Sequence, residues 1–487
     1  MSREILRDTL FYLPAKVIPS LVGVIAIPVL TRLLSPEQYG QYILAMTSLY
    51  LIAALCISWL VSITIRFHIV YGVEILFQKS CRLLMYSILL ACILWLGASQ
   101  LLGETLGSWL FIAAGLVWLI SYGGFEYFSG WFRSRNLPIA YSLAMSWRSL
   151  VGLLIAVVLL NLGFQGGAIV ILGFAIAMLI GLFFLPSHAL NTDSRQLKFE
   201  DSELDINALL RYGIPVAISN MVIVGLSTAD RYIINSQMGS ELVAIYGANY
   251  DLAEKTIFFV NSMLLLSSSV IGFRIFEKEG DAKAADFLSR LMRLYLLIAP
   301  PLVLVLAILS PNIVKILLPE QYHSGAFILP AVATGGLLVG VMHRYSLVLS
   351  FNKRTDIIMW CSASALLVNI SSCFLLLPKY GILGAAFSTL IAYASWLLFI
   401  RLAASKYSLP QFPWATFFRV CGALIVAAAT IFYIKHQEFS SNFLVLALSS
   451  VFGFIVYGLT LILFKEVTQK EFKLIISIIS TRFNNVR

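Results

Sequence analysis

The sequence predicts an all-α integral membrane protein with about 14 transmembrane helices, arranged as two parallel six-helix repeats followed by two C-terminal helices. Composition, an internal repeat and the distribution of basic residues lead to this fold class. Of the 487 residues, 60% are hydrophobic and only 12% are charged. A soluble globular protein is about half apolar and about a quarter charged, so this chain lies outside that class.

Each predicted helix is an apolar stretch of about 20 residues, the length that crosses a bilayer core. In the first half these stretches cover residues 10–33, 41–64, 83–103, 107–128, 139–161 and 166–186. In the second half they cover 212–236, 242–273, 294–316, 326–350, 357–377 and 381–400, and two more follow at 416–434 and 441–464. We therefore divide the chain into an N-terminal lobe with an inter-lobe linker (1–211), a C-terminal lobe (212–407), and a last segment with helices 13 and 14 and an amphipathic cytoplasmic tail (408–487).

The repeat is visible as two pairs of similar segments in the same order. LSPEQYGQYILA, at 34–45, resembles MGSELVAIYGAN, at 238–249, and LGFQGGAI, at 162–169, resembles YGILGAAF, at 380–387. Repeats at a fixed period indicate a duplicated unit. Because each unit has an even number of helices, both units enter the membrane in the same orientation.

Basic residues follow one set of loops. With the N-terminus in the cytoplasm, cytoplasmic segments carry 24 of the 34 Lys and Arg residues, and outer loops carry only Lys315, Lys379 and Lys435. This bias predicts that both termini are cytoplasmic. The net charge of +10 does not gather into one stripe, so we expect no nucleic-acid partner.

Enzymes and metalloproteins are disfavoured by the absence of their motifs from the sequence. There is no P-loop, HExxH, nucleophile elbow or GxGxxG, and the six cysteines lie in apolar runs without CxxC spacing. We expect no enzyme activity, no metal site and no organic cofactor. A membrane glycosyltransferase or polymerase would need a set of catalytic carboxylates, and no such set occurs.

Ionisable residues inside membrane helices usually face a cavity or a partner. Arg32 and Arg419 lie near helix ends, where the side chain can reach the interface, and we expect the same of Arg231. Lys255 follows Asp251 by one helical turn, so it forms an intrahelical ion pair or contacts a ligand; both interpretations stay open.

Arg148, Lys16 and Arg344 have no acidic residue within a turn of their own helices. They predict a positively charged cavity between the lobes, with Lys255 as a fourth candidate. Arg offers paired donors that suit phosphate, and Lys offers a compact charge. The sequence therefore predicts an anionic, phosphate-bearing substrate.

A second polar set lies on helices 7, 11 and 12. Asp230, Asn369, Thr389 and a backbone carbonyl would supply the oxygen atoms that a cation such as Na⁺ prefers. Hydrogen bonding between helices explains the same residues and is the interpretation that the sequence by itself favours; a cation site is the alternative.

Three segments carry a family resemblance: PVLTRLLSPEQYGQY, TADRYIINSQMGSELVAIYGANYDLAEK and LPKYGILGAAFSTLIAY. In this order they resemble the polysaccharide transporter family, the Wzx-type O-antigen and exopolysaccharide flippases. This family belongs to the multidrug/oligosaccharidyl-lipid/polysaccharide (MOP) exporter superfamily. The resemblance implies an inner-membrane protein that flips an undecaprenyl-pyrophosphate-linked oligosaccharide by alternating access. A multidrug/cation antiporter or a lipid II-type flippase of the same superfamily is the alternative.

The resemblance also implies roles for individual residues and partners. Basic cavity residues would hold the pyrophosphate, and Asp230, Asn369, the Ala385 carbonyl and Thr389 match a cation site of the lipid II flippases, with Na⁺ or H⁺ as coupling ion. The chain departs from that pattern by having Cys373 where a second carboxylate is expected. The implied partners are the lipid-linked oligosaccharide, membrane lipids, and polymerase and chain-length proteins of polysaccharide assembly.

Overall fold

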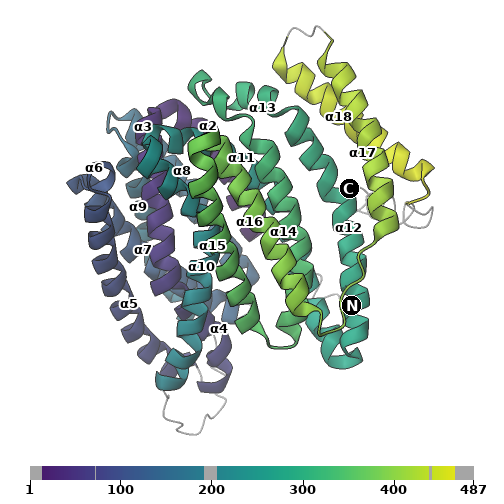
Figure 1. Cartoon of the computed structure of the whole chain (residues 1–487). Coiled ribbons are helices and arrows are strands. Elements are labelled where there is room, and N and C mark those ends of the chain that lie inside the picture. Colours follow the sequence, from purple (N-terminus) through teal and green to yellow (C-terminus); the bar gives the residue numbers. More distant parts are fainter. Residues whose placement is uncertain (1–13, 72, 136, 191–205, 438–440, 467–487) are drawn as a thin grey trace, which may run out of the picture.

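The computed structural model describes residues 14–71, 73–135, 137–190, 206–437 and 441–466, and these residues form helices joined by short turns, without any strand. Figure 1 shows the helices standing side by side as a bundle. The first half of the chain contributes α2 (Pro14–Leu33), α3 (Pro36–Cys56), α4 (Ser58–Tyr71), α5 (Val73–Leu101), α6 (Gly103–Leu106), α7 (Trp109–Ser134), α8 (Pro138–Asn161) and α9 (Gly167–Leu190).

The second half repeats this succession of long helices. It contributes α10 (Ile206–Met238), α11 (Ser240–Glu279), α12 (Asp281–Ile308), α13 (Ser310–Leu317), the 3₁₀ helix η1 (Glu320–Gly325), α14 (Ile328–Phe351), α15 (Thr355–Tyr380) and α16 (Ile382–Ala404). Two more helices follow, α17 (Trp414–Lys435) and α18 (Asn442–Leu463).

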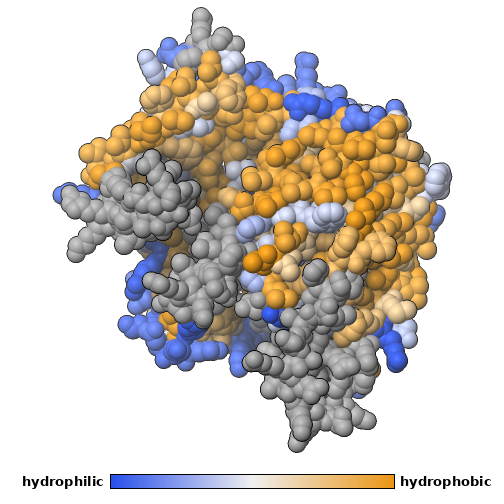
Figure 2. All heavy atoms as spheres, turned by 180° about the vertical axis from the view of Figure 1, so that it is seen from behind, coloured by the Kyte–Doolittle hydropathy of each residue, from blue (hydrophilic) through white to orange (hydrophobic). Residues whose placement is uncertain are grey.

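Thirteen helical segments of the described chain are long and apolar enough to cross a membrane, with α3 and the start of α4 forming one of them. The fourteenth expected span falls on α11, which is not among the thirteen. Residues 263–270 of this helix lie outside those whose side chains the structure describes, and in the sequence they belong to an apolar stretch without charged residues, 256–273. Figure 2 shows hydrophobic side chains covering most of the visible middle of the molecule, with hydrophilic ones gathered toward its rims. The protein is therefore a multi-pass membrane protein.

Two predicted spans are divided in the structure. The span predicted at 41–64 begins at Pro36 and is interrupted at Ile57, where α3 ends. The span predicted at 294–316 ends at Ile308, and α13 begins as a separate helix with Pro311 in its first turn. Proline lacks the amide that would continue a helix and disfavours helical geometry in the residue before it, which explains the second division.

The similar segments at 34–45 and 238–249 both lie where one helix ends and the next begins. Ser35 caps α3, and its hydroxyl accepts from the Gln38 amide while the Gln38 side chain accepts from the Ser35 amide. In the second half Gly239, with φ +86°, turns the chain into α11; glycine adopts this left-handed backbone without steric penalty. These two junctions are packed against each other at one end of the bundle, here named the junction end.

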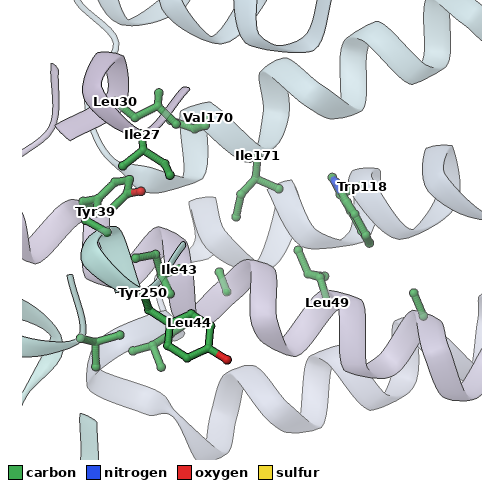
Figure 3. Packing of buried hydrophobic residues seen from close by; sticks show 14 of the residues in the cluster. Ile27, Leu30, Tyr39, Ile43, Leu44, Leu49, Trp118, Val170, Ile171 and Tyr250 are labelled. Atoms are coloured by element: carbon green, nitrogen blue, oxygen red, sulfur yellow. The ribbon is translucent and has the colours of Figure 1, made fainter. Parts of the chain in front are cut away.

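The two halves touch closely at the junction end. A Cβ placed on Gly40 of α3 would lie 1.8 Å from the carbonyl oxygen of Ser240, so only glycine fits there. Arg32, at the end of α2, donates to the carbonyl oxygen of Leu317 at 2.7 Å and thereby connects the two halves. Figure 3 shows buried side chains of α2, α3, α9 and α11 that belong to one hydrophobic cluster in this region, including Tyr39 and Tyr250.

The last two helices are attached to the edge of the bundle, along α12 (Figure 1). Glu466, just after α18, accepts hydrogen bonds from Arg293 of α12 at 2.9 Å and from Thr416 of α17 at 2.6 Å. It also forms an ion pair with Arg419 at 2.7 Å. Arg419, which was expected to extend to the interface, is partly exposed near the start of α17 and pairs with this carboxylate. The predicted amphipathic tail otherwise lies outside the described residues.

Candidate functional site

A cavity of about 650 Å³ lies between the two halves. Side chains of α2, α3, α7, α8 and α9 line it from the first half, and side chains of α10 and α11 line it from the second half. Its titratable charged residues are three bases and one acid: Arg148, Arg231, Lys255 and Asp251. The cavity therefore has an excess of positive charge, as the sequence predicted, although its basic residues differ in part from those expected.

Asp251 holds two of the three bases. Its Oδ1 lies 2.8 Å from Arg231 Nη2, and its Oδ2 lies 3.0 Å from Lys255 Nζ. The intrahelical pair of Asp251 and Lys255 is thus present, and Lys255 also faces the cavity. The expectation that Arg231 extends to the interface was wrong. Its guanidinium is buried at the cavity wall, where it also donates to Thr47 of α3 at 3.3 Å.

Arg148 lines the cavity from α8, as predicted, but it is not unpaired. Its guanidinium forms an ion pair with Glu126 of α7. A search for partners within one helix could not find this contact, because α7 and α8 lie side by side only in the folded chain. The sequence analysis did not single out Glu126. Its position as an acidic residue inside the predicted span 107–128 could have identified it.

Lys16 lies near this pair but does not line the cavity. Its side chain is exposed, and its charge interacts with those of Glu126, Arg133 and Arg148. The structure does not place Lys16 on the cavity wall, which on α2 begins one turn later, at Pro19; its role as a phosphate ligand stays a prediction.

Arg344 is the clearest error among the predicted site residues. It is only 2% exposed and lies inside the second half, away from the cavity. Its guanidinium donates to Asn261 Oδ1 at 2.8 Å and to the Gly340 carbonyl oxygen, and it lies 4.1 Å from the ring centre of Tyr295. Neutral oxygen atoms and an aromatic face from α11, α12 and α14 satisfy this charge, and sequence spacing could not reveal them.

The four predicted cation-site residues do come together. The Thr389 hydroxyl lies 3.0 Å from Asp230 Oδ2 and 3.2 Å from the Ala385 carbonyl oxygen, and Asn369 Nδ2 donates to it at 3.4 Å. Tyr246 of α11 donates its hydroxyl proton to Asp230 Oδ2. Tyr246 was not predicted, although it aligns with Tyr42 in the repeat. Asp230 and Asn369 are 1% and 0% exposed.

Two oxygen atoms of this cluster remain without a hydrogen-bond partner. Asp230 Oδ1 and Asn369 Oδ1 are buried, and neither accepts a hydrogen bond from the described residues. A buried oxygen without a donor costs about 1–3 kcal/mol. Carboxylate, amide, hydroxyl and carbonyl oxygens are suitable ligands for a hard monovalent cation, so the donor set fits such an ion. Cys373 is fully buried on the same helix as Asn369, one turn further along, and adds no charge.

Aromatic side chains form one wall of the cavity, and the sequence analysis missed them. Trp118 and Tyr122 of α7 are stacked with ring centres 4.4 Å apart, and Tyr50 of α3 meets Trp118 edge-on at 5.2 Å. Tyr50 is 42% exposed and lines the cavity. Stacked aromatic rings with hydroxyl groups provide an apolar face together with hydrogen-bonding groups.

Comparisons with solved structures show the fold. The chain is similar to the lipid II flippase MurJ in an inward closed conformation, with a TM-score of 0.74 and 14% identity, covering 94% of this chain and 100% of that one. It is similar to a multidrug resistance MATE family transporter in an inward-facing conformation, with a TM-score of 0.60 and 14% identity over 82% and 95% of the two chains.

A third similar structure is a MOP superfamily transporter from Pyrococcus furiosus described as having a binding pocket of reverse polarity, with a TM-score of 0.57 and 15% identity over 82% and 95%. A comparison with curated proteins found no match. The model of the family described as polysaccharide biosynthesis protein matches residues 5–269, more than half of the chain. The chain therefore belongs to the polysaccharide biosynthesis protein family, and its fold is similar to those of solved MOP superfamily transporters.

Proposed function

We propose that this protein is a flippase that moves an undecaprenyl-pyrophosphate-linked oligosaccharide from the inner to the outer leaflet of the bacterial cytoplasmic membrane, for surface polysaccharide assembly. The observation that carries the proposal is the cavity between the two halves, with three basic side chains and one acidic side chain on its wall. A cationic drug would be repelled by this wall, whereas a pyrophosphate would be attracted to it.

The ion pairs in the cavity provide a way to bind the pyrophosphate. Arg148 and Glu126, and Arg231 and Lys255 with Asp251, are paired in this structure. A guanidinium can exchange a carboxylate for a phosphate with the same paired geometry. When the cavity is empty, two carboxylates would hold the three bases and leave one net positive charge; when the lipid enters, the bases would bind phosphate oxygens. The aromatic wall of Tyr50, Trp118 and Tyr122 would lie against the apolar faces of sugar rings.

Movement of the lipid would follow alternating access. The halves are in contact at the junction end through Gly40 and Ser240. Near the opposite end, the Arg66 guanidinium lies 4.3 Å from the ring centre of Tyr212, and Asn220 donates to Ser58 at 2.8 Å. The cavity lies between these two contacts. Opening them in turn would expose the cavity first to the cytoplasm and then to the outer face.

We assign the cluster of Asp230, Asn369, Ala385 and Thr389 to a coupling cation, Na⁺ or H⁺. The two unpartnered oxygens and the Ala385 carbonyl would hold the ion, and Tyr246 would keep Asp230 oriented. This cluster lies among α10, α15 and α16, whereas the cavity is lined by α10 and α11 on the same side. Asp230 and Arg231 are consecutive residues of α10. A cation bound at Asp230 would therefore change the electrostatic potential at Arg231, on the cavity wall.

The remaining parts of the proposal concern location and partners. The loop charges support a cytoplasmic location for both termini, and the junction end would then be at the outer face. Polymerase and chain-length proteins of the same assembly pathway would receive the flipped lipid.

The test is deletion of the gene, followed by mass spectrometry of the lipid-linked oligosaccharides. We expect a complete undecaprenyl-pyrophosphate repeat unit to accumulate and to disappear when a plasmid copy is supplied. With Arg148→Ala on the plasmid, flux should fall about 10- to 100-fold, since a charge-assisted contact contributes about 1.5–3 kcal/mol; Arg148→Lys should retain more flux than Arg148→Ala. Protein level in the membrane is the control.

Two other outcomes would contradict the proposal. An unchanged lipid pool together with increased sensitivity to cationic dyes would indicate a drug antiporter. Accumulation of a peptide-bearing lipid instead of an oligosaccharide would indicate a lipid II-type flippase.

A further inference from the structure

One face of α11 carries a column of polar residues that points into the second half. Tyr246, Tyr250, Glu254 and Asn261 recur at helical spacing and therefore share this face. Tyr246 donates to Asp230, and the Tyr250 hydroxyl lies 3.1 Å from the Tyr393 hydroxyl of α16. Further along, Asn261 Nδ2 lies 3.0 Å from His343 Nδ1, and Asn261 Oδ1 accepts from Arg344.

Glu254 is the exception in this column, because nothing in the described part of the chain gives it a hydrogen bond or an ion pair. It lines a second cavity of about 50 Å³ together with Tyr250, Tyr393 and Asn261. This volume is sufficient for one or a few water molecules but not for an organic solute. The apolar residues Ile257, Val332 and Val339 line the same cavity.

The nearby bases are already engaged. Asp251, one turn earlier on α11, pairs with both Arg231 and Lys255. The titratable and charged groups that face Glu254 are Asp230 and Arg231 from α10, Asp251, Lys255 and Tyr250 from α11, and Tyr393 from α16. From α14 the cavity receives only Val332, Gly336 and Val339. Asp230 and Asp251 oppose a negative charge on Glu254, whereas Arg231 and Lys255 favour it but are both shared with Asp251.

A carboxylate at membrane depth without its own counter-ion is costly. A proton is the smallest ligand that would neutralise the carboxylate and remove this free-energy cost. The cavity beside Glu254 has room for the water that would deliver the proton. A metal ion fits this space less well, because only the Glu254 carboxylate is free to bind it: the Tyr250 and Tyr393 hydroxyls bond each other, and Asn261 Oδ1 accepts from Arg344.

We propose that Glu254 is a proton-binding site of the second half, separate from the cluster at Asp230. The carboxylate takes a proton from hydronium in the small cavity, which leaves water and a neutral carboxyl group, and it returns the proton by the reverse step. Because Asp230 and Glu254 act on each other electrostatically, a cation at Asp230 favours release of the proton from Glu254. By linkage, the proton weakens cation binding to the same extent. The proton site does not depend on the identity of the transported lipid.

The test is infrared difference spectroscopy of the purified full-length protein in lipid, titrated from about pH 4 to about pH 9, a range that begins near the ordinary pKa of a glutamate side chain. The variants are Glu254→Gln and, as matched control, Glu241→Gln, because Glu241 is an exposed glutamate in the first turn of the same helix. We expect a protonated carboxyl band that titrates in the wild type and in Glu241→Gln and that is absent in Glu254→Gln. The same band in Glu254→Gln would overturn the proposal.

A second variant tests the coupling to Asp230. In Asp230→Asn one opposing negative charge is removed, so the midpoint of the Glu254 band should move to lower pH. An unchanged midpoint would refute the coupling. Neither measurement uses transport or the lipid substrate, so a failure of the flippase proposal leaves this result interpretable.

Discussion

Single residues in this protein are held by partners on other helices. Asp251 neutralises two bases, Arg231 from α10 and Lys255 from its own helix. In contrast, Asp230 Oδ1 and Asn369 Oδ1 are buried without a donor among the described residues. The first arrangement is a satisfied network, whereas the second leaves two acceptors for a ligand. The cavity wall at Asp251 thus has its charges paired, whereas the cluster of Asp230, Asn369, Ala385 and Thr389 has acceptor atoms without a donor.

At this scale we predict that Na⁺ stabilises the protein through Asp230. In Na⁺ at about 100 times its dissociation constant, the free energy of unfolding should rise by about 2.7 kcal/mol relative to choline at equal ionic strength. Thermal unfolding of the purified protein measures the change in Tm. The gain should be lost in Asp230→Asn and kept in Cys373→Ser, which alters a neighbouring buried side chain without removing a ligand. Equal gains in both variants would exclude Asp230 as a ligand.

Among the helices, α17 and α18 are joined to α12 by one buried carboxylate as well as by apolar packing. Glu466 has only 2% of its side chain exposed, while the side chains of Arg293 and Arg419 are 34% and 45% exposed. Burial would raise the pKa of Glu466, but hydrogen bonds from Thr416, Arg293 and Arg419 outweigh burial and lower the pKa below its ordinary value. The helix pair also packs apolar residues such as Val420 and Tyr457 against α12.

We predict that Glu466→Gln lowers stability by about 1–2 kcal/mol, less than for a fully buried pair because both arginines are partly exposed. Since the pKa of Glu466 is lowered on folding, its contribution is complete at neutral pH. The contribution is lost as pH falls below about 4.5 and through the lower pKa of the folded state. Thermal unfolding between neutral and acidic pH measures both effects.

The matched control is Glu320→Gln, at an exposed glutamate in η1. This variant should unfold like the wild type at each pH. If Glu466→Gln also unfolded like the wild type at neutral pH, the carboxylate would not stabilise the helix pair.

For the whole molecule, the two halves meet at both ends of the cavity. The contact at the junction end is backbone against backbone, at Gly40 and Ser240, and it continues along α3 and α11 to Ile43 and Gly247. Transport by alternating access requires this contact to open. A covalent link across it should therefore stop transport without unfolding either half.

The prediction uses the variant Ile43→Cys with Gly247→Cys. A Cβ on Gly247 would lie 3.5 Å from Ile43 Cγ2, and removal of the isoleucine side chain makes room for a disulfide, which needs Cβ atoms about 3.5–4.5 Å apart. After oxidation we expect the lipid-linked oligosaccharide to accumulate as in the gene deletion, and reductant should restore flux. Each single substitution retains the six native cysteines and is the control. Continued flux in the cross-linked protein would contradict opening at this end.

The sequence alone determined the membrane class, the approximate helix positions, the duplicated unit and the resemblance to the family. These properties depend on apolar runs, turn residues and motifs, and all of them are local along the chain. The family resemblance also selected Asp230, Asn369, Ala385 and Thr389, which the structure brings together; their role as a cation site stays a prediction.

Only the tertiary structure decided which charges meet. It paired Arg148 with Glu126 and Arg231 with Asp251, placed Arg344 against Asn261 and Tyr295, and left Lys16 outside the cavity. A charge at membrane depth must find a partner, but which helix supplies that partner depends on how the helices pack and rotate. Spacing within one helix carries no information on that choice, so the cavity wall could be predicted as basic but not residue by residue.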